Sequence, residues 1–264
     1  MTTAAPASLP GMLRLLEVMR RLRDPLTGCP WDQQQDAQSL ARYTLEEAYE
    51  VVAAIEQRDP DELRGELGDL LFQVVFLAQL ASERGEYAFD DVANGIADKL
   101  TQRHPHVFAG EGPEAHQRWE SIKADERRQR GVTGALGDVP LALPALSRAA
   151  KLGKRAAAVG FDWPDADGPG QKILEELAEV QQARAGFGTS TVEDELGDVL
   201  LAVTSLARHL QVDPETALRR ANSRFEARFA LMERLATGRG QQLNDMDAAQ
   251  LDALWNEAKQ GIQA

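Results

Sequence analysis

The sequence has little cysteine, few aromatic residues and no apolar run long enough to cross a bilayer. Its single cysteine, Cys29, excludes an internal disulfide and a metal site built from several cysteines. The most apolar segment, residues 70–81, is interrupted by Gln73 and Gln79, so we expect a buried helix there and no membrane contact. Residues 1–10 lack a basic segment followed by an apolar one, so we expect no secretory signal and a cytoplasmic protein.

Positive charge is also scarce. Lysine and arginine number 29 against 42 aspartate and glutamate residues, which gives a formal net charge of −13. This balance argues against broad, direct binding of nucleic acids or anionic membranes through the protein surface. An acidic protein can still bind a phosphate compound when a metal ion carries the positive charge.

The pattern of apolar residues lacks the strict alternation that predicts β-strands, and follows helical spacing instead. With 264 residues, 43% of them hydrophobic, the chain suits one large or two modest domains. Residues 131–144 hold three glycines and two prolines and few large side chains, which indicates a linker. We therefore predict an all-α protein of two tandem related helical bundles, residues 1–130 and 145–264, joined by this linker.

Two helix starts and two loops are also predicted. Asp59 should cap a helix with Pro60 at its first position, and Thr191 with Asp194 should cap another. The segments 29–32 and 104–106 are expected to form loops.

A duplicated acidic unit organises both halves. The segment 66–69, Glu-Leu-Gly-Asp, returns 129 residues later as residues 195–198. The same offset relates Leu45-Glu46-Glu47 to Leu174-Glu175-Glu176, and relates Glu50 to Glu179. Several acidic positions within an apolar frame at one offset indicate an internal duplication.

Helix geometry predicts what each acidic unit does. Residues three or four apart share one helix face, and a break at residues 58–61 would fold two helices into an antiparallel pair. Four carboxylates would then meet, although two unpaired charges ~4 Å apart already repel by about 4 kcal/mol. Oxygen ligands suit Mg²⁺, with Mn²⁺ as a substitute. The predicted metal ligands are Glu176, Glu179, Glu195 and Asp198, with a second possible site at Glu47, Glu50, Glu66 and Asp69.

Two other interpretations compete with a metal site. The acids could form a solvated helix face, and Thr44 with Glu47 fits a capping box at a helix start. In the second copy Ile173 replaces Thr44 and cannot cap, yet the glutamate is still present, which favours the metal site. Gly68 and Gly197 interrupt strong helices, and close approach of the facing helix or of a ligand would explain them.

Basic and aromatic residues accompany the second acidic unit. Lys172 lies one turn before Glu176, and a polyphosphate needs such a cation beside a metal. The candidate nucleotide-binding residues are Lys172, Arg224, Arg228 and Trp255. The alternative is that the two arginines form exposed ion pairs and that the tryptophan is core. Tyr43 stands in the first copy where Lys172 stands in the second, so we expect the second copy to be the main catalytic unit.

These motifs together resemble the two-domain bacterial MazG-type nucleoside triphosphate pyrophosphohydrolases. The resemblance also includes the segments 29–32, 103–108, 159–163 and 222–226. It implies an all-α bundle, a homodimer, Mg²⁺, and hydrolysis of a nucleoside triphosphate to monophosphate and pyrophosphate. It assigns the second set of acids as metal ligands and the basic and aromatic set as nucleotide contacts. Ser223-Arg224 departs from the Glu-Lys of other members, and an arginine can bind phosphate differently.

The mechanism expected from this resemblance is attack of a metal-activated water on the α-phosphorus. Lys172, Arg224 and Arg228 would steady the leaving pyrophosphate, and Glu175 would orient the ligands. The role would be nucleotide-pool cleansing or stress-related nucleotide control. A di-iron bundle would need Glu-x-x-His, which no histidine here completes. The other alternative is a non-enzymatic helical protein that binds a metal, a nucleotide or a partner. The sequence leaves open the base and sugar, the number of metal ions, the general base and the activity of the first copy.

Overall fold

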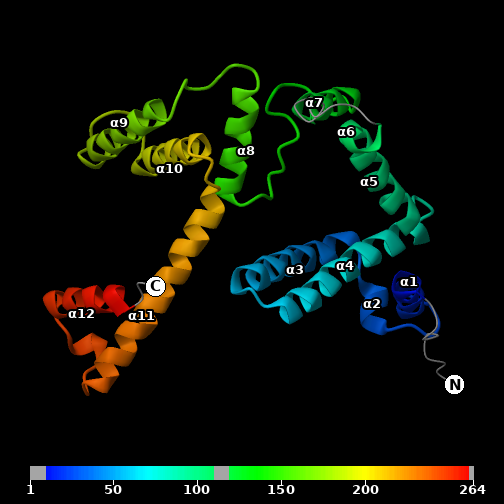
Figure 1. Cartoon of the computed structure of the whole chain (residues 1–264), viewed down its shortest axis with the longest axis horizontal. Coiled ribbons are helices and arrows are strands. Elements are labelled where there is room, and N and C mark those ends of the chain that lie inside the picture. Colours follow the sequence, from blue (N-terminus) through cyan, green and yellow to red (C-terminus); the bar gives the residue numbers. More distant parts are fainter. Residues whose placement is uncertain (1–9, 110–118, 262–264) are drawn as a thin grey trace. The chain divides into compact units, whose positions relative to one another are not determined.

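The structure, a computed structural model, describes residues 10–109 and 119–261. These residues form helices and turns and contain no strand, which confirms the all-α class. The chain divides into two compact units, Met1–Lys123 (unit 1) and Ala124–Ala264 (unit 2), each drawn in its own colour range in Figure 1. The division falls within α7 (Trp119–Gln129), ahead of the expected linker at residues 131–144. The limits 1–130 and 145–264 for the two domains stay a prediction.

Unit 1 is organised around a helical hairpin. The helices α3 (Ala37–Gln57) and α4 (Pro60–Glu83) pack side by side. The turn between them places Arg58 in the left-handed region at φ 59°, and the Asp59 side chain accepts hydrogen bonds from the first amides of α4. This cap and the proline after it confirm the predicted helix start. The other helices are α1 (Gly11–Leu22), α2 (Pro30–Gln34), α5 (Phe89–Arg103) and α6 (Pro105–Phe108).

Three local expectations in unit 1 are wrong. The first acidic helix begins at Ala37, because Asp36 caps it, so Thr44 lies in its interior and donates its hydroxyl hydrogen bond to the Leu40 carbonyl. The capping-box interpretation of Thr44 and Glu47 is therefore excluded. Residues 29–32 and 104–106 were expected as loops, yet a proline in each segment occupies the first turn of a short helix, α2 or α6.

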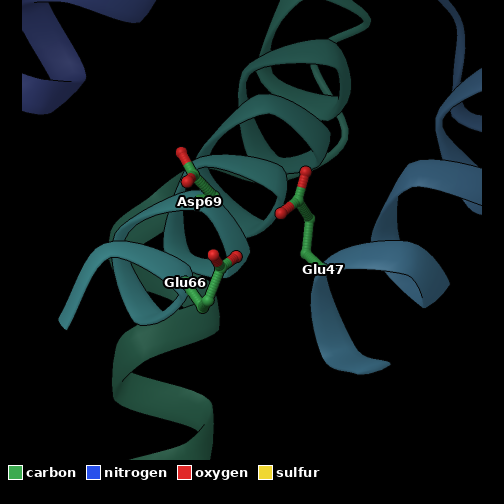
Figure 2. A group of neighbouring side chains, drawn as sticks. All are labelled: Glu47, Glu66 and Asp69. Atoms are coloured by element: carbon green, nitrogen blue, oxygen red, sulfur yellow. The ribbon is translucent and has the colours of Figure 1, made fainter. Parts of the chain in front are cut away.

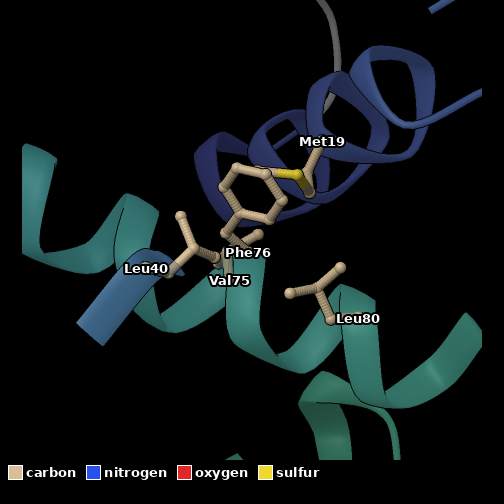
Figure 3. Packing of buried hydrophobic residues seen from close by; sticks show 5 residues of the cluster. All are labelled: Met19, Leu40, Val75, Phe76 and Leu80. Atoms are coloured by element: carbon tan, nitrogen blue, oxygen red, sulfur yellow. The ribbon is translucent and has the colours of Figure 1, made fainter. Parts of the chain in front are cut away.

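The core of unit 1 lies where α1, α3 and α4 meet. Its buried side chains, shown in Figure 3, are Met19, Leu40, Val75, Phe76 and Leu80. Three of them come from residues 70–81, which confirms the buried helix expected there. Within the described ranges, no helix is long and apolar enough to cross a membrane.

Unit 2 contains a second hairpin, formed by α9 (Asp167–Arg184) and α10 (Val192–His209). Thr191 and Asp194 form a reciprocal capping box at the start of α10, as the sequence predicts. The helix α8 (Ala145–Ala157) packs against α10. The long α11 (Pro214–Gly238) packs against α12 (Ala248–Gly261) around a buried cluster that includes Met232 and Leu254.

Candidate active site

The hairpin of unit 2 brings three predicted ligands together. Glu176 and Glu179 project from consecutive turns of α9, and Glu195 comes from the first turn of α10. One carboxylate oxygen of each lies within 4.8 Å of the other two. Glu176 and Glu195 are only 4% and 7% exposed, so this group is not an ordinary solvated helix face. We refer to these three residues as the second acidic group.

The three carboxylates of the second acidic group carry more negative charge than the neighbouring Lys172 can balance. The Lys172 ammonium lies 2.7 Å from Glu176 Oε1 and pairs with Glu175 at the same distance, and hydrogen bonds to Glu175 and then Glu176 raise its pKa. Glu176 Oε2 is buried and has no hydrogen-bond partner. Burial, followed by the nearby charges of Glu176 and Glu195, raises the pKa of Glu179. An unpaired buried oxygen among crowded carboxylates fits a hard divalent cation.

Unit 1 also brings three carboxylates together, but its third residue is Asp69, where the group in unit 2 contains Glu179. Figure 2 shows Glu47 on α3 facing Glu66 and Asp69 on α4, and oxygens of these three residues also lie within 4.8 Å of one another. Burial and then the Asp69 carboxylate raise the pKa of Glu47, and burial and then Glu50 raise that of Glu66. We call these three residues the first acidic group. Its Glu47 and Glu66 are half-buried, whereas Glu176 and Glu195 at the corresponding positions of unit 2 are buried.

The structure gathers the remaining predicted acids less tightly. Asp198 does not belong to the compact second group, but it lines the cavity beside it. Glu50 likewise lies outside the compact first group. Glu175 is exposed and pairs with Lys172, a position from which it can orient that lysine.

A cavity of about 450 Å³ opens beside the second acidic group. Lys172, Glu176 and Asp198 line it on the acidic side. The rest of its wall comes from α8, α10, the segment before α9 and Leu136, which precedes α8. It includes Leu152, Ala156, Leu201, Phe161 and Trp163. Its size falls within the range of about 300–1,000 Å³ that is typical of ligand sites.

An ion-pair network holds the aromatic part of the wall. Arg208 Nη1 donates to Asp162 Oδ2 at 2.8 Å, and His209 Nε2 lies 3.0 Å from Asp162 Oδ1. Hydrogen bonding from Arg208 is the main cause that lowers the pKa of Asp162 to about 2. The indole of Trp163 lies against Gly168, where an added Cβ would come within 2.2 Å of the ring. These contacts fix the segment 160–163 beside the cavity.

The other predicted nucleotide-binding residues lie on α11 and α12. Trp255 packs on Phe225 with ring centroids 5.3 Å apart and contacts the α11–α12 core. Arg224 and Arg228 belong to the middle of α11. None of these three residues lines the cavity beside the second acidic group. Their role as nucleotide contacts stays a prediction.

Several wall residues were not identified from the sequence as functional. Asp162 and Trp163 were noted only within the segment 159–163 of the family resemblance, with no role assigned, and Arg208 and Ser205 were not considered. A usable signal was present, because the 129-residue offset aligns Ser205 with Phe76 and Ala202 with Gln73. At these two positions the smaller residue lines the cavity of unit 2, and the larger residue is buried in unit 1.

Comparison with known proteins gives consistent matches. A family profile described as "MazG nucleotide pyrophosphohydrolase domain" matches residues 35–108. The chain is 48% identical over 252 residues to a protein of Escherichia coli K12 named nucleoside triphosphate pyrophosphohydrolase, covering 93% of this chain and 96% of that one. It is 41% identical over 247 residues to a Thermotoga maritima protein named nucleoside triphosphate pyrophosphohydrolase/pyrophosphatase MazG, covering 94% and 95%.

A Mycolicibacterium smegmatis protein named nucleoside triphosphate pyrophosphohydrolase is 40% identical over 163 residues, which covers 60% of this chain and 50% of that protein. These matches do not favour the non-enzymatic alternative. Nearly complete coverage at 48% identity, together with the duplicated acidic hairpins, shows that this chain is an enzyme of the MazG family of nucleotide pyrophosphohydrolases.

Proposed function

We propose that the protein hydrolyses nucleoside triphosphates to monophosphate and pyrophosphate with Mg²⁺, and that the second acidic group is the centre of this reaction. The observation that carries the proposal is the unpaired, buried Glu176 Oε2 within a triad of carboxylates. Glu176, Glu179, Glu195 and Asp198 would hold the metal. When bound, Mg²⁺ supplies charge neutralisation and a coordinated water of lowered pKa.

The protein's own groups divide the remaining work. Lys172 places a positive charge where a phosphate chain would meet the carboxylates, and Glu175 keeps that lysine oriented through its 2.7 Å ion pair. Buried Glu176 and Glu195 provide a partly desolvated setting in which charge interactions are stronger than in water. Water adds to the α-phosphorus, the bond to the bridging oxygen breaks, and pyrophosphate leaves. The role we propose is nucleotide-pool cleansing or stress-related nucleotide control.

The position of attack can be tested with isotopically labelled water. Hydrolysis in H₂¹⁸O with Mg²⁺ should place the label in the monophosphate, because the water oxygen becomes bonded to the α-phosphorus. Label in pyrophosphate would mean attack at the β-phosphorus, and release of diphosphate would overturn the proposed reaction.

A substitution tests whether the second acidic group is the centre of the reaction. Glu195→Gln should abolish most of the release of monophosphate. Glu193 is an exposed acid on the same helix but lies outside the acidic group, so Glu193→Gln is the matched control and should keep the activity.

We also propose that the enzyme is a homodimer. Leu196, Leu200 and Val203 form an exposed stripe at helical spacing on α10, and Leu174 on α9 is 70% exposed. An added Cβ at Gly197 meets no atom within 4 Å, so approach of the facing helix does not explain this glycine or Gly68. Close approach of a second protein chain or of a ligand would explain these two glycines.

The oligomeric state can be measured by sedimentation equilibrium at micromolar concentration. The wild type should have the mass of a dimer, and charges introduced by Leu196→Glu and Leu200→Glu should shift it toward the monomer. A wild-type protein that stays monomeric over this range would contradict the dimer.

A further inference from the structure

The helix α8 is strongly basic in an acidic chain. It contains four basic residues and no acidic one, whereas the whole chain has a formal net charge of −13. Figure 1 shows this helix in unit 2, where it packs against α10. Arg148, Lys151 and Arg155 follow the spacing i, i+3, i+7, so they lie on one face over about 10 Å of helix. We call these three residues the basic stripe.

The stability of α8 does not explain the basic stripe. Like charges three or four residues apart destabilise a helix, and the stripe contains two such pairs, Arg148 with Lys151 and Lys151 with Arg155. The helix dipole favours a cation in the last turn, which accounts for Arg155. Arg148 lies at the opposite end, in the first turn, where the dipole opposes a cation. A stabilising arrangement would place acids among these residues, and α8 has none.

The acidic residues next to α8 do not neutralise the stripe. The Glu215 carboxylate accepts a hydrogen bond from the Ser147 amide, and Asp162 pairs with Arg208. Within the described part of the chain, no acidic side chain forms an ion pair with a stripe residue, and Arg148 Nε is buried without a hydrogen-bond partner. Lys151 is exposed, and the two arginines of the stripe are half-buried. The stripe is therefore an uncompensated positive surface that an anion from solution can reach.

We propose that the basic stripe binds the phosphate chain of an anionic ligand, at a site separate from the second acidic group and independent of Mg²⁺. A guanidinium group binds phosphate oxygens through two parallel hydrogen bonds, and an ammonium group acts as a point charge. Three such cations in a row match a linear anion that carries several charges. The inference goes beyond the proposed function, because binding at the stripe requires no hydrolysis.

A small phosphate compound matches the stripe better than a nucleic acid does. The helix α8 contains no aromatic side chain on which a base could stack, and the net charge of −13 repels a long polyanion. Inorganic polyphosphates and nucleoside triphosphates share the phosphate chain, so either can be the source of the ligand.

Removal of Mg²⁺ separates the stripe from the second acidic group. Without a cation, the carboxylates of the second acidic group repel a phosphate chain. Lys172 is already paired with Glu175 and Glu176. The stripe holds no carboxylate, so its affinity for a phosphate chain remains when a chelator is present.

The test is calorimetric titration of the full chain with inorganic tripolyphosphate in EDTA at low ionic strength. We expect one tripolyphosphate per chain, and binding should weaken as salt is added. The double variant Lys151→Gln/Arg155→Gln should bind at least tenfold more weakly. Arg234→Gln, which removes an exposed arginine of α11, is the matched control and should change the affinity less than twofold. Glu195→Gln should retain the binding, which separates this inference from the proposed function.

A nucleoside triphosphate, titrated in the same way, distinguishes the two sources. Equal or weaker affinity than that of tripolyphosphate would show that the phosphate chain alone is recognised. Tighter binding that is lost in the double variant would assign the stripe to nucleotides. Either result supports the site.

Absence of tripolyphosphate binding by the wild type would overturn the inference, and so would equal binding by the folded double variant. Loss of binding in Lys172→Met without loss in the double variant would also overturn it, because the anion would then lie at the second acidic group. Single-stranded DNA that binds through the stripe more tightly than tripolyphosphate would replace the phosphate compound by a nucleic acid. Lys151→Gln alone provides the comparison if the double variant does not fold, with an expected loss of at least threefold.

Discussion

Unit 1 and unit 2 contain the same acidic hairpin but use the space beside it differently. In unit 1 the space is filled by Phe76 and its neighbours, and Tyr43 packs on Trp31 at 5.8 Å between ring centroids. In unit 2 it is a cavity, and Lys172 occupies the position of Tyr43. Within the part of the chain that the structure describes, both units therefore bring three carboxylates together, whereas a cavity of about 450 Å³ lies beside the acidic group of unit 2 and a packed core occupies the corresponding region of unit 1.

The largest expected effect comes from removing one charge in each acidic group. Glu195→Gln should lower kcat at least ~10³-fold, because it removes a carboxylate from the group that we propose as the metal site and so weakens transition-state charge stabilisation. Glu66→Gln, the same change in unit 1, should lower kcat less than about threefold. Monophosphate release at saturating substrate measures both. Similar losses in the two variants would show that both units contribute to turnover.

The filled core of unit 1 should be the more sensitive to truncation. Phe76→Ala should lower the free energy of unfolding of unit 1 by about 3–5 kcal/mol, because it leaves a cavity in a packed core. Ser205→Ala, at the corresponding position of unit 2, should change stability by about 0.5 kcal/mol or less. Urea denaturation with hydrogen exchange resolved by segment would assign each transition. Comparable losses at both positions would contradict the difference in packing.

Substitution of Lys172 tests whether this lysine distinguishes the two units. Lys172→Met should lower kcat/KM by about 10–100-fold, the range expected when a charged hydrogen bond worth about 1.5–3 kcal/mol is lost. Lys172→Arg should recover part of the activity. Tyr43→Lys in a Glu195→Gln background should give no new activity, because the cavity of unit 1 stays filled. Appearance of activity there would show that the cation alone separates the units.

The smallest expected effect is a pH dependence of unit 2. Hydrogen bonds from Arg208 and then His209 lower the folded-state pKa of Asp162 from 3.8 to about 2. The ionised form is favoured by folding, so this stabilisation is present above pH ~4 and is lost as the pH falls toward 2. Allowing for solvent screening, it should amount to about 1 kcal/mol.

Calorimetry between pH 2.5 and 5 on Asp162→Asn should reveal a flatter dependence of the unit 2 transition temperature than in the wild type. Glu233→Gln, an exposed acid of α11, provides the control. An unchanged slope in Asp162→Asn would remove the ion pair as a source of acid sensitivity.

Sequence patterns predicted the helices and the acidic groups because these depend on local spacing. The caps at Asp59 and Thr191 were found for the same reason. The cavity was not predicted, because it results from the volumes of side chains on α8, α9 and α10 together. Nor could sequence alone place Trp255, whose packing on Phe225 depends on how α12 folds against α11. The short helices α2 and α6 were missed because both segments were interpreted as loops, although a proline is favoured in the first turn of a helix.

The filled interior around Phe76 also suggests in which direction successive substitutions would change a duplicated hairpin. Adding a large apolar side chain to an unused hollow increases packing, so each such substitution can be accepted on stability alone. Removing these side chains to reopen the hollow lowers stability at every step until a ligand can bind. A duplicated hairpin that loses its ligand would therefore drift toward the closed form, and the return would require several unfavourable substitutions in succession. In this sense the open unit is the state that selection must maintain, and the closed unit is the one that packing alone favours.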